Sequence, residues 1–154
     1  MRYKIPVSTL VLVYTPELDV LLIERADYPG HWQSVTGSQE ADETLLDTAV
    51  RELREETGIE AAAYGGLVDW DVANEFEIFA KWRGRYPPGT TRNTEHVFAL
   101  EVPAPVPVTL APHEHLQAVW LPWREAADRC FSWSNREAIE MLPQRTRSSP
   151  RSST

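Results

Sequence analysis

The chain has 154 residues, 42% hydrophobic and 25% charged, which is the composition of one globular domain large enough to bury a core. Its formal net charge of -8 argues against general affinity for nucleic acids or anionic membranes, since cationic surface drives both kinds of binding. The single cysteine, Cys130, excludes an intramolecular disulfide. The first residues contain no signal-peptide core and no apolar run spans a bilayer, so we expect a cytoplasmic location.

Two paired strands are predicted at the start of the chain. Residues 5–14 are apolar and β-branched almost throughout, which is typical of a central strand buried on both faces. A turn follows, and residues 20–25 form the second strand. Residues 32–36 then lead directly into a polar loop and a helix. This order predicts an α/β domain with a mixed sheet.

An amphipathic helix is predicted from about Glu43 to Thr57, with Asp42 as its N-cap and Gly58 as the left-handed residue that ends it. Its apolar stripe consists of residues at helical spacing: Leu45, Leu46, Ala49, Val50 and Leu53. This stripe should face the core.

Three glutamates, Glu52, Glu55 and Glu56, fall within about one helical turn beside that stripe. Their like charges repel, and Arg51 and Arg54 offset only part of the repulsion. A divalent cation bound to the carboxylate oxygens would offset it more completely. The alternative is a solvated helix face, which is the more frequent explanation of an isolated charge run.

Two more strands are predicted at residues 67–72 and 75–82, followed by a loop at 83–92 that contains three arginines. The rings of Phe76 and Phe79 are either core or a platform for a flat ligand, and the residue types favour core. The loop is either a solvated hairpin tip or a mobile flap that brings cations toward phosphates.

The residue pattern of the last third of the chain predicts a strand at 94–102, then a stiff proline-rich connector and a short strand at 116–121. A helix follows from Pro122 to Arg129, and Ser134 is expected to cap another at 135–142. Pro143 should stop that helix. We therefore predict a domain at residues 1–142 and a polar, disordered tail at 143–154.

His113, Glu114 and His115 lie together before the strand at 116–121. They are residue types that bind metals, but no spaced partner completes a zinc set. Zinc is therefore not expected. A single carboxylate ligand from Glu114 to a hard metal is the better hypothesis.

The glutamate-rich helix and its flanks match every fixed position of the Nudix box. The matching positions are Gly37, Glu43, Arg51-Glu52-Leu53, Glu55-Glu56 and Gly58-Ile59. The chain thus resembles the Nudix hydrolases, whose fold is an α/β/α sandwich around a mixed β-sheet with a catalytic loop–helix–loop. The resemblance implies Mg²⁺ as cofactor, with Mn²⁺ as a substitute. It implies metal ligands at Glu52, Glu56, Glu114, Glu55 and, through its carbonyl, Gly37.

In that comparison Arg51 orients Glu43 and its neighbours, and Glu52, Glu55 and Glu56 carry the catalysis. A water near these carboxylates is the implied nucleophile. Which carboxylate accepts the proton of that water is left open.

Segments outside the box resemble the branch of the family that acts on a pterin triphosphate. They include residues 32–38, 76–79, 91–95 and 132–136. The resemblance implies hydrolysis of dihydroneopterin triphosphate to the monophosphate and pyrophosphate, in folate biosynthesis. Its implied substrate contacts are Lys4, Arg25, Thr36, Phe76, Glu77, Ile78, Phe79, Glu114 and Ser132. On this comparison Phe76 and Phe79 become an aromatic wall for the pterin.

Three alternatives stay open from the sequence. The first is a house-cleaning Nudix enzyme acting on nucleoside triphosphates, because that reaction needs the same box. The second is a Nudix-like binding module without catalysis, against which the intact glutamates argue. The third is an acidic globular domain with no active site. The oligomeric state and the number of metal ions are not predicted.

Overall fold

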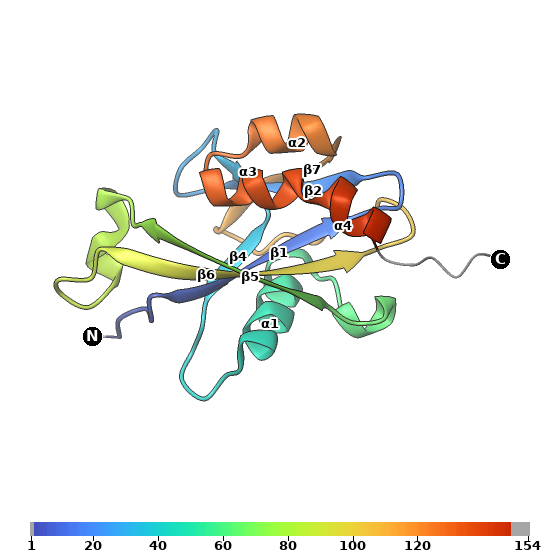
Figure 1. The fold of residues 1–154 in the computed structure, drawn as a ribbon. Helices are drawn as coiled ribbons and strands as arrows, with labels where there is room; N and C mark the ends of the chain where they lie inside the picture. Colours follow the sequence, from blue (N-terminus) through green and yellow to red (C-terminus); the bar gives the residue numbers. More distant parts are fainter. Residues whose placement is uncertain (1, 149–154) are drawn as a thin grey trace.

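The computed structural model describes residues 2–148, which form a mixed seven-stranded sheet with helices on both faces (Figure 1). The strand order is β3-β2-β1-β6-β5, with β4 also paired to β1 and β7 to β2. The strands are β1 (Val7–Tyr14), β2 (Asp19–Arg25), β3 (Trp32–Gln33), β4 (Val35–Ser38), β5 (Val68–Glu77), β6 (Arg92–Glu101) and β7 (His115–Pro122). The predicted mixed sheet is confirmed.

The helices form the two outer layers of a sandwich. In Figure 1, α1 lies on one side of the sheet and α2 and α3 lie on the other. The helices are α1 (Leu45–Thr57), α2 (Trp123–Arg129), α3 (Trp133–Glu140) and α4 (Leu142–Ser148), with short 3₁₀ helices η1 (Ala61–Tyr64) and η2 (Ala80–Arg85). Among the helices of residues 2–148, none combines the length and apolar character needed to cross a bilayer.

Strand β1 explains why residues 5–14 are almost continuously apolar. Leu10 and Leu12 pack into the core under α2 and α3, whereas Val11 and Val13 pack into the core under α1. Successive side chains of a strand point to opposite faces, so a strand covered on both sides needs apolar residues at every position. The predicted central strand is confirmed.

The register of β1 places the helix box at one end of the sheet. Its first half pairs with β4, so that Thr9 lies opposite Gly37, and with β6, so that Ser8 lies opposite Glu95. The loop after β4 and the helix α1 therefore start where β6 also begins. This arrangement brings two distant segments to the same end of the sheet.

Helix α1 starts later than predicted. Its N-cap is Thr44, whose hydroxyl accepts a hydrogen bond from the Asp47 amide while the Asp47 carboxylate accepts one from the Thr44 amide. This reciprocal capping box satisfies two free amides and decides the start of the helix. The predicted cap, Asp42, lies in the preceding loop with φ 69°, and Glu43 lies outside the helix. Gly58 ends the helix with φ 76°, as predicted.

The two strands predicted at 67–72 and 75–82 are wrong. A single strand, β5, runs through residues 68–77, and its pairing with β6 shifts register between Asp69 and Ala73. Within this bulge Asp71 has φ 56°, and its amide donates to the Asp69 carboxylate at 2.8 Å. The bulge lets one strand continue where the residue pattern suggested a break. Beyond residue 77 the chain turns into η2 instead of extending the sheet.

The C-terminal helices also differ from the prediction. Ser132, and not Ser134, caps α3 by accepting a hydrogen bond from the Asn135 amide at 3.2 Å. Pro143 does not end the helical region, because it lies in the first turn of α4, where a proline leaves no required amide missing. The predicted disordered tail is therefore wrong for residues 143–148, and residues 149–154 lie outside the described part.

Candidate active site

A cleft of about 1350 Å³ runs across the end of the sheet where β4 ends and β1 and β6 begin. Three groups of side chains line it: the carboxylates of α1, a set of cations from the N-terminus, β2 and η2, and an aromatic and polar wall from β5, η2 with its N-cap, β6 and α3. All the predicted site residues line this cleft, from Lys4 near the N-terminus to Ser132 before α3.

Arg51 holds the carboxylate end together. Its guanidinium donates to both oxygens of Glu43 at 2.6 and 2.9 Å, to Glu52 at 2.6 Å and to Glu55 at 3.3 Å. It also donates to the Ser38 carbonyl at 3.1 Å, which ties the helix to the end of β4. Because Arg51 organises its neighbours in this way, it acts by positioning the glutamates.

The pairing with Arg51 lowers the pKa of Glu43 to about 2 from an ordinary value of 4.5. A carboxyl with a lowered pKa in the folded state stabilises the protein above pH 4.5, and this stabilisation is lost as the pH falls toward 2. We expect Glu43→Gln to lower the free energy of unfolding at pH 7 by about 1–3 kcal/mol. The difference from the unmodified protein should shrink as the pH falls from 4.5 toward 2, in denaturant titrations across this range.

Exposed Glu17 provides the control for that titration. Glu17→Gln should leave the unfolding free energy nearly unchanged at every pH, as is usual for a surface substitution. A loss in Glu43→Gln that is the same at pH 7 and pH 2.5 would contradict an ion pair as the source of stability.

Glu56 is the most deeply buried of the three glutamates, with 2% of its surface exposed. Within residues 2–148 neither of its carboxylate oxygens accepts a hydrogen bond of good geometry. Burial, Glu52 and Glu114 raise its pKa well above the ordinary value, and the nearby Thr36 amide opposes this only in part. A buried carboxylate is costly unless a counter-charge compensates it.

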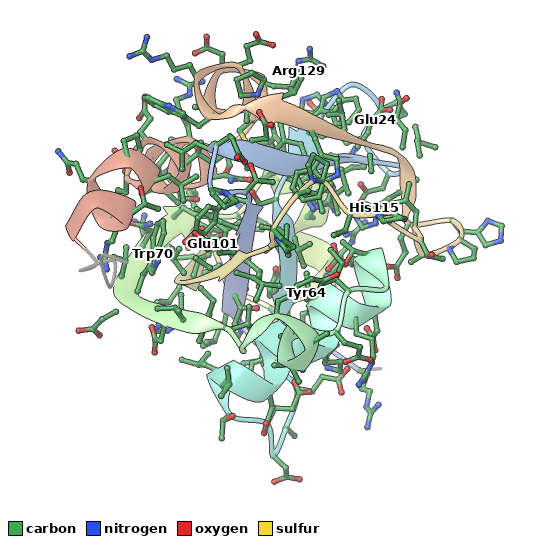
Figure 2. The ribbon with its side chains drawn as sticks, turned by 90° about the vertical axis from the view of Figure 1, so that its right-hand side faces the viewer. Glu24, Tyr64, Trp70, Glu101, His115 and Arg129 are labelled. Atoms are coloured by element: carbon green, nitrogen blue, oxygen red, sulfur yellow. The ribbon has the colours of Figure 1, made fainter. Side chains whose placement is uncertain are left out.

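His115 does not supply that counter-charge. Its Nε2 lies 3.4 Å from Glu56 Oε1, but burial and the Arg25 guanidinium lower the pKa of His115 and favour the neutral ring. Figure 2 labels His115 at the start of β7. A cation from solution would therefore find an uncompensated carboxylate in Glu56.

The carboxylate end fits a hard divalent metal that keeps much of its water. Glu52 and Glu114 are close enough to Glu56 to raise its pKa, whereas Glu55 is about half exposed and turned to Arg51. In the described part of the chain, no three His, Cys, Asp or Glu side chains converge as a complete cage. Mg²⁺ suits such a partial set, because it binds few carboxylates and fills its other positions with water and phosphate oxygens.

Gly37 leaves room for the packed side chain of Glu52. A Cβ added at Gly37 would lie 2.1 Å from Glu52 Cδ and 2.4 Å from its Oε1. The Glu52 side chain thus lies directly against the backbone of β4. We expected Gly37 to allow a ligand to approach, and the structure adds the contact with Glu52 as a second reason for glycine at this position.

The cations of the cleft gather around Asp27, and Arg25 lies 4.3 Å from the centre of the Trp82 ring. Arg25 donates to both oxygens of Asp27 at 2.7 Å, and Arg85 donates to one of them at 3.1 Å. Burial, followed by Arg85 and Arg25, lowers the pKa of Lys4, which shows that three cationic groups lie close together. One aspartate among three cations leaves a surplus of positive charge suited to phosphates.

Arg85 is a site residue that the sequence alone did not single out. The cluster of arginines at 83–92 was the available signal, and it left a solvated tip and a flap as equal alternatives. In the structure Arg83 and Arg85 belong to η2 and line the cleft, and the Lys4 amide donates to the Arg85 carbonyl at 2.8 Å. These two arginines lie in the connection between β5 and β6 and bring cations to the cleft, and the mobility of the loop stays a prediction.

Aromatic side chains, including Phe76, Phe79 and Trp82, form a wall of the cleft. Phe76 is half-buried and Phe79 is 42% exposed, so the interpretation of both rings as core is wrong, whereas Ile78 is buried. Phe79 stacks on Trp82, with ring centroids 5.2 Å apart and an angle of 5° between the planes. Glu77 is exposed and pairs with Arg83 at 3.3 Å. This wall offers flat apolar surface to a ligand.

Two predicted contacts also have structural roles. The Thr36 hydroxyl donates to the Thr9 carbonyl at 2.9 Å, and Ser132 caps α3. Both line the cleft. Their substrate contacts stay predictions.

The structure adds Asn93, Glu95 and Asn135 to the lining of the cleft. All three are buried polar residues. Asn93 and Glu95 alternate along β6 with residues of the opposite face, in phase with the core residues Val97 and Ala99. Polar residues at core-facing positions of a strand were the signal that could have identified them.

The family model of the NUDIX domain matches residues 4–142 of this chain. The chain belongs to the Nudix family. Its relatives include the dihydroneopterin triphosphate diphosphatase of Escherichia coli K12, which is 46% identical over 142 residues, 91% of this chain and 93% of the relative. The enzyme of that name from Haemophilus influenzae is 40% identical over 91% of this chain and 89% of the relative.

Solved structures agree with the Nudix fold. The structure of the E. coli dihydroneopterin triphosphate pyrophosphohydrolase superposes with a TM-score of 0.87 at 45% identity, over 92% of this chain and 97% of that one. A Nudix structure from Listeria monocytogenes has a TM-score of 0.77 at 19% identity and covers 97% and 100% of the two chains, which supports the fold alone. The predicted fold class is confirmed.

Proposed function

We propose that this Nudix protein hydrolyses dihydroneopterin triphosphate to dihydroneopterin monophosphate and pyrophosphate. The observation that carries the proposal is that carboxylates, cations and an aromatic wall line one cleft, with Lys4 near Glu52 and Arg25 4.3 Å from the centre of the Trp82 ring. A triphosphate attached to a flat ring has parts that match all three groups. The identity of 46% with a diphosphatase of this name, over nearly the whole of both chains, supports the same substrate.

Each part of the chain has a role in this proposal. Lys4, Arg25 and Arg85 bind phosphate oxygens, and Arg51 keeps the glutamates in place. The aromatic wall holds the ring and thereby fixes the position of the attached phosphates relative to α1. Glu52, Glu56 and Glu114 would hold Mg²⁺, with Glu55 and the Gly37 carbonyl as further ligands. Bound there, the metal would offset the negative charge of the triphosphate and of the leaving pyrophosphate.

Mg²⁺ is proposed over Mn²⁺ because the site offers carboxylates and space for water and phosphate oxygens, the ligands that Mg²⁺ prefers. Mn²⁺ has similar preferences and is the expected substitute. The substrate is the small-molecule partner in this proposal. The cytoplasmic location predicted from the sequence goes with it.

A pyrophosphate-release assay tests the proposed function. With dihydroneopterin triphosphate and Mg²⁺ we expect pyrophosphate and the monophosphate in equal amounts, and almost no turnover after chelation of divalent ions. A panel of nucleoside triphosphates, assayed in parallel, should have lower kcat/KM. Equal or better turnover of a nucleotide would overturn the pterin assignment, and no turnover of any triphosphate would favour a binding module.

A further inference from the structure

Strand β6 carries two buried acceptor atoms without partners, and one of their residues, Asn93, lies opposite Phe76. Within the described chain, Glu95 Oε1 and Asn93 Oδ1 have no hydrogen-bond partner, and the two residues are only 4% and 2% exposed. Both residues line the cleft. They are two positions apart on β6, so their side chains point to the same face of the sheet.

The surroundings hold these acceptors in place. Asn93 Nδ2 donates to the Ser8 hydroxyl at 2.8 Å, which leaves the Asn93 carbonyl as its free end. Phe76 on β5 lies directly opposite Asn93 in the β5–β6 register, so its ring lies on the same face. The side-chain amide nitrogen of Asn135 donates to the Ser34 hydroxyl at 3.0 Å, and within the described residues it makes no hydrogen bond to either acceptor.

The folded protein holds the Glu95 carboxyl at an energetic cost. Burial raises the pKa of Glu95 to about 7, and the Ser134 hydroxyl opposes this only in part. Buried acceptors are almost always hydrogen-bonded in native proteins, so the unpaired Oε1 of Glu95 and the unpaired carbonyl of Asn93 on the same face of β6 call for a ligand. Such a ligand must bring two or more N–H donors to one edge and fit beside an aromatic ring.

The amino group and adjacent ring N–H of a pterin have these properties. We propose that Glu95, with Asn93 beside it, binds the N–H donors of the substrate's ring and thereby selects the ring that enters the cleft. This inference rests on the proposed function. It assigns ring recognition to β6, on the side of the sheet opposite α1, so that ring binding and phosphate chemistry use different faces.

The test compares Glu95→Gln with the unmodified protein, using dihydroneopterin without phosphates as the probe. A glutamine presents an N–H group to the ring donors and carries no charge, so the affinity measured by calorimetry should fall about 10- to 100-fold. With dihydroneopterin triphosphate, KM should rise by a similar factor while kcat changes less than about threefold, because the carboxylates of α1 are untouched.

Glu101→Gln is the matched control. Glu101 ends the same strand, is exposed and does not line the cleft (Figure 2). Its substitution should change neither the affinity for dihydroneopterin nor KM. A fall in affinity equal to that of Glu95→Gln would overturn the proposal.

Stability measurements separate ring recognition from damage to the fold. A carboxyl whose folded pKa of about 7 lies above its ordinary 4.5 destabilises the folded state increasingly between these pH values. Glu95→Gln should therefore have a higher Tm than the unmodified protein at pH 8. Weaker binding together with a lower Tm at pH 8 would indicate a structural role and overturn the proposal.

The two proposals fail in different ways. If the unmodified protein does not release pyrophosphate from dihydroneopterin triphosphate, the proposed function fails, and the calorimetry still tests the ring contact. If the unmodified protein does turn over this substrate but Glu95→Gln keeps the same KM and the same affinity for dihydroneopterin, the ring assignment to Glu95 fails. A loss confined to kcat also contradicts it.

Discussion

Glu56→Gln is expected to lower kcat with dihydroneopterin triphosphate by about 100-fold or more. Replacing a residue that only hydrogen-bonds to a metal ligand typically costs about 10- to 100-fold in metal affinity or activity. Glu56 is proposed as a direct ligand, so its replacement should cost at least as much. The substitution keeps the size of the side chain and removes a carboxylate that is 2% exposed and has no hydrogen-bond partner within residues 2–148. The fold should therefore persist, with no loss in Tm at pH 8.

Two measurements show whether this loss has the proposed cause. Mg²⁺ titrations of activity should give a higher half-saturating concentration in Glu56→Gln, because the site has lost a ligand. Glu60→Gln, an exposed position just beyond α1, is the control and should keep full activity. Unchanged turnover in Glu56→Gln would refute the carboxylate end as the metal site.

Gly37→Ala is expected to lower kcat/KM by about 10- to 100-fold with little change in Tm. The added Cβ would lie 2.1 Å from Glu52 Cδ, and the flexible Glu52 side chain can move away without shifting the backbone. Its carboxylate would then leave the 2.6 Å hydrogen bond from Arg51. The metal site would lose a ligand although no glutamate has been replaced.

A double-mutant comparison tests whether Gly37→Ala acts through Glu52. If it does, Gly37→Ala combined with Glu52→Gln should be no worse than Glu52→Gln alone, whereas independent effects would multiply. Gly84→Ala is the matched control, because a Cβ there meets no described atom within 4 Å and Gly84 does not line the cleft. Full activity in Gly37→Ala would show that the Glu52 position is not needed for catalysis.

The cleft explains how an acidic protein can bind a triphosphate. The formal net charge is -8, yet Lys4, Arg25 and Arg85 lie together around Asp27. The pairing of Arg25 and Arg85 with Asp27 keeps the two guanidinium groups in fixed positions in the cleft. Positive charge is thus concentrated where the phosphates are proposed to bind.

The catalytic helix was predictable because its signals are local. The apolar stripe, the three glutamates and Gly58 all lie within one continuous segment, and a helix of fixed geometry places them without help from the other elements. The same segment carries the family resemblance, which the NUDIX domain match at residues 4–142 confirms. Only the start of the helix was misplaced, since Thr44 and Asp47 compete with Asp42 for the cap.

The remaining site residues depended on the tertiary structure, because they come from segments far apart in the chain. Strand register sets Glu95 beside Ser8 and Asn93 opposite Phe76, and no local pattern reports that register. The bulge in β5 and the turn into η2 bring Arg85 to the cleft, where the sequence suggested a second strand. The sequence by itself therefore determined the family and predicted the cluster of carboxylates, whereas packing across the sheet decided which other residues line the cleft with them.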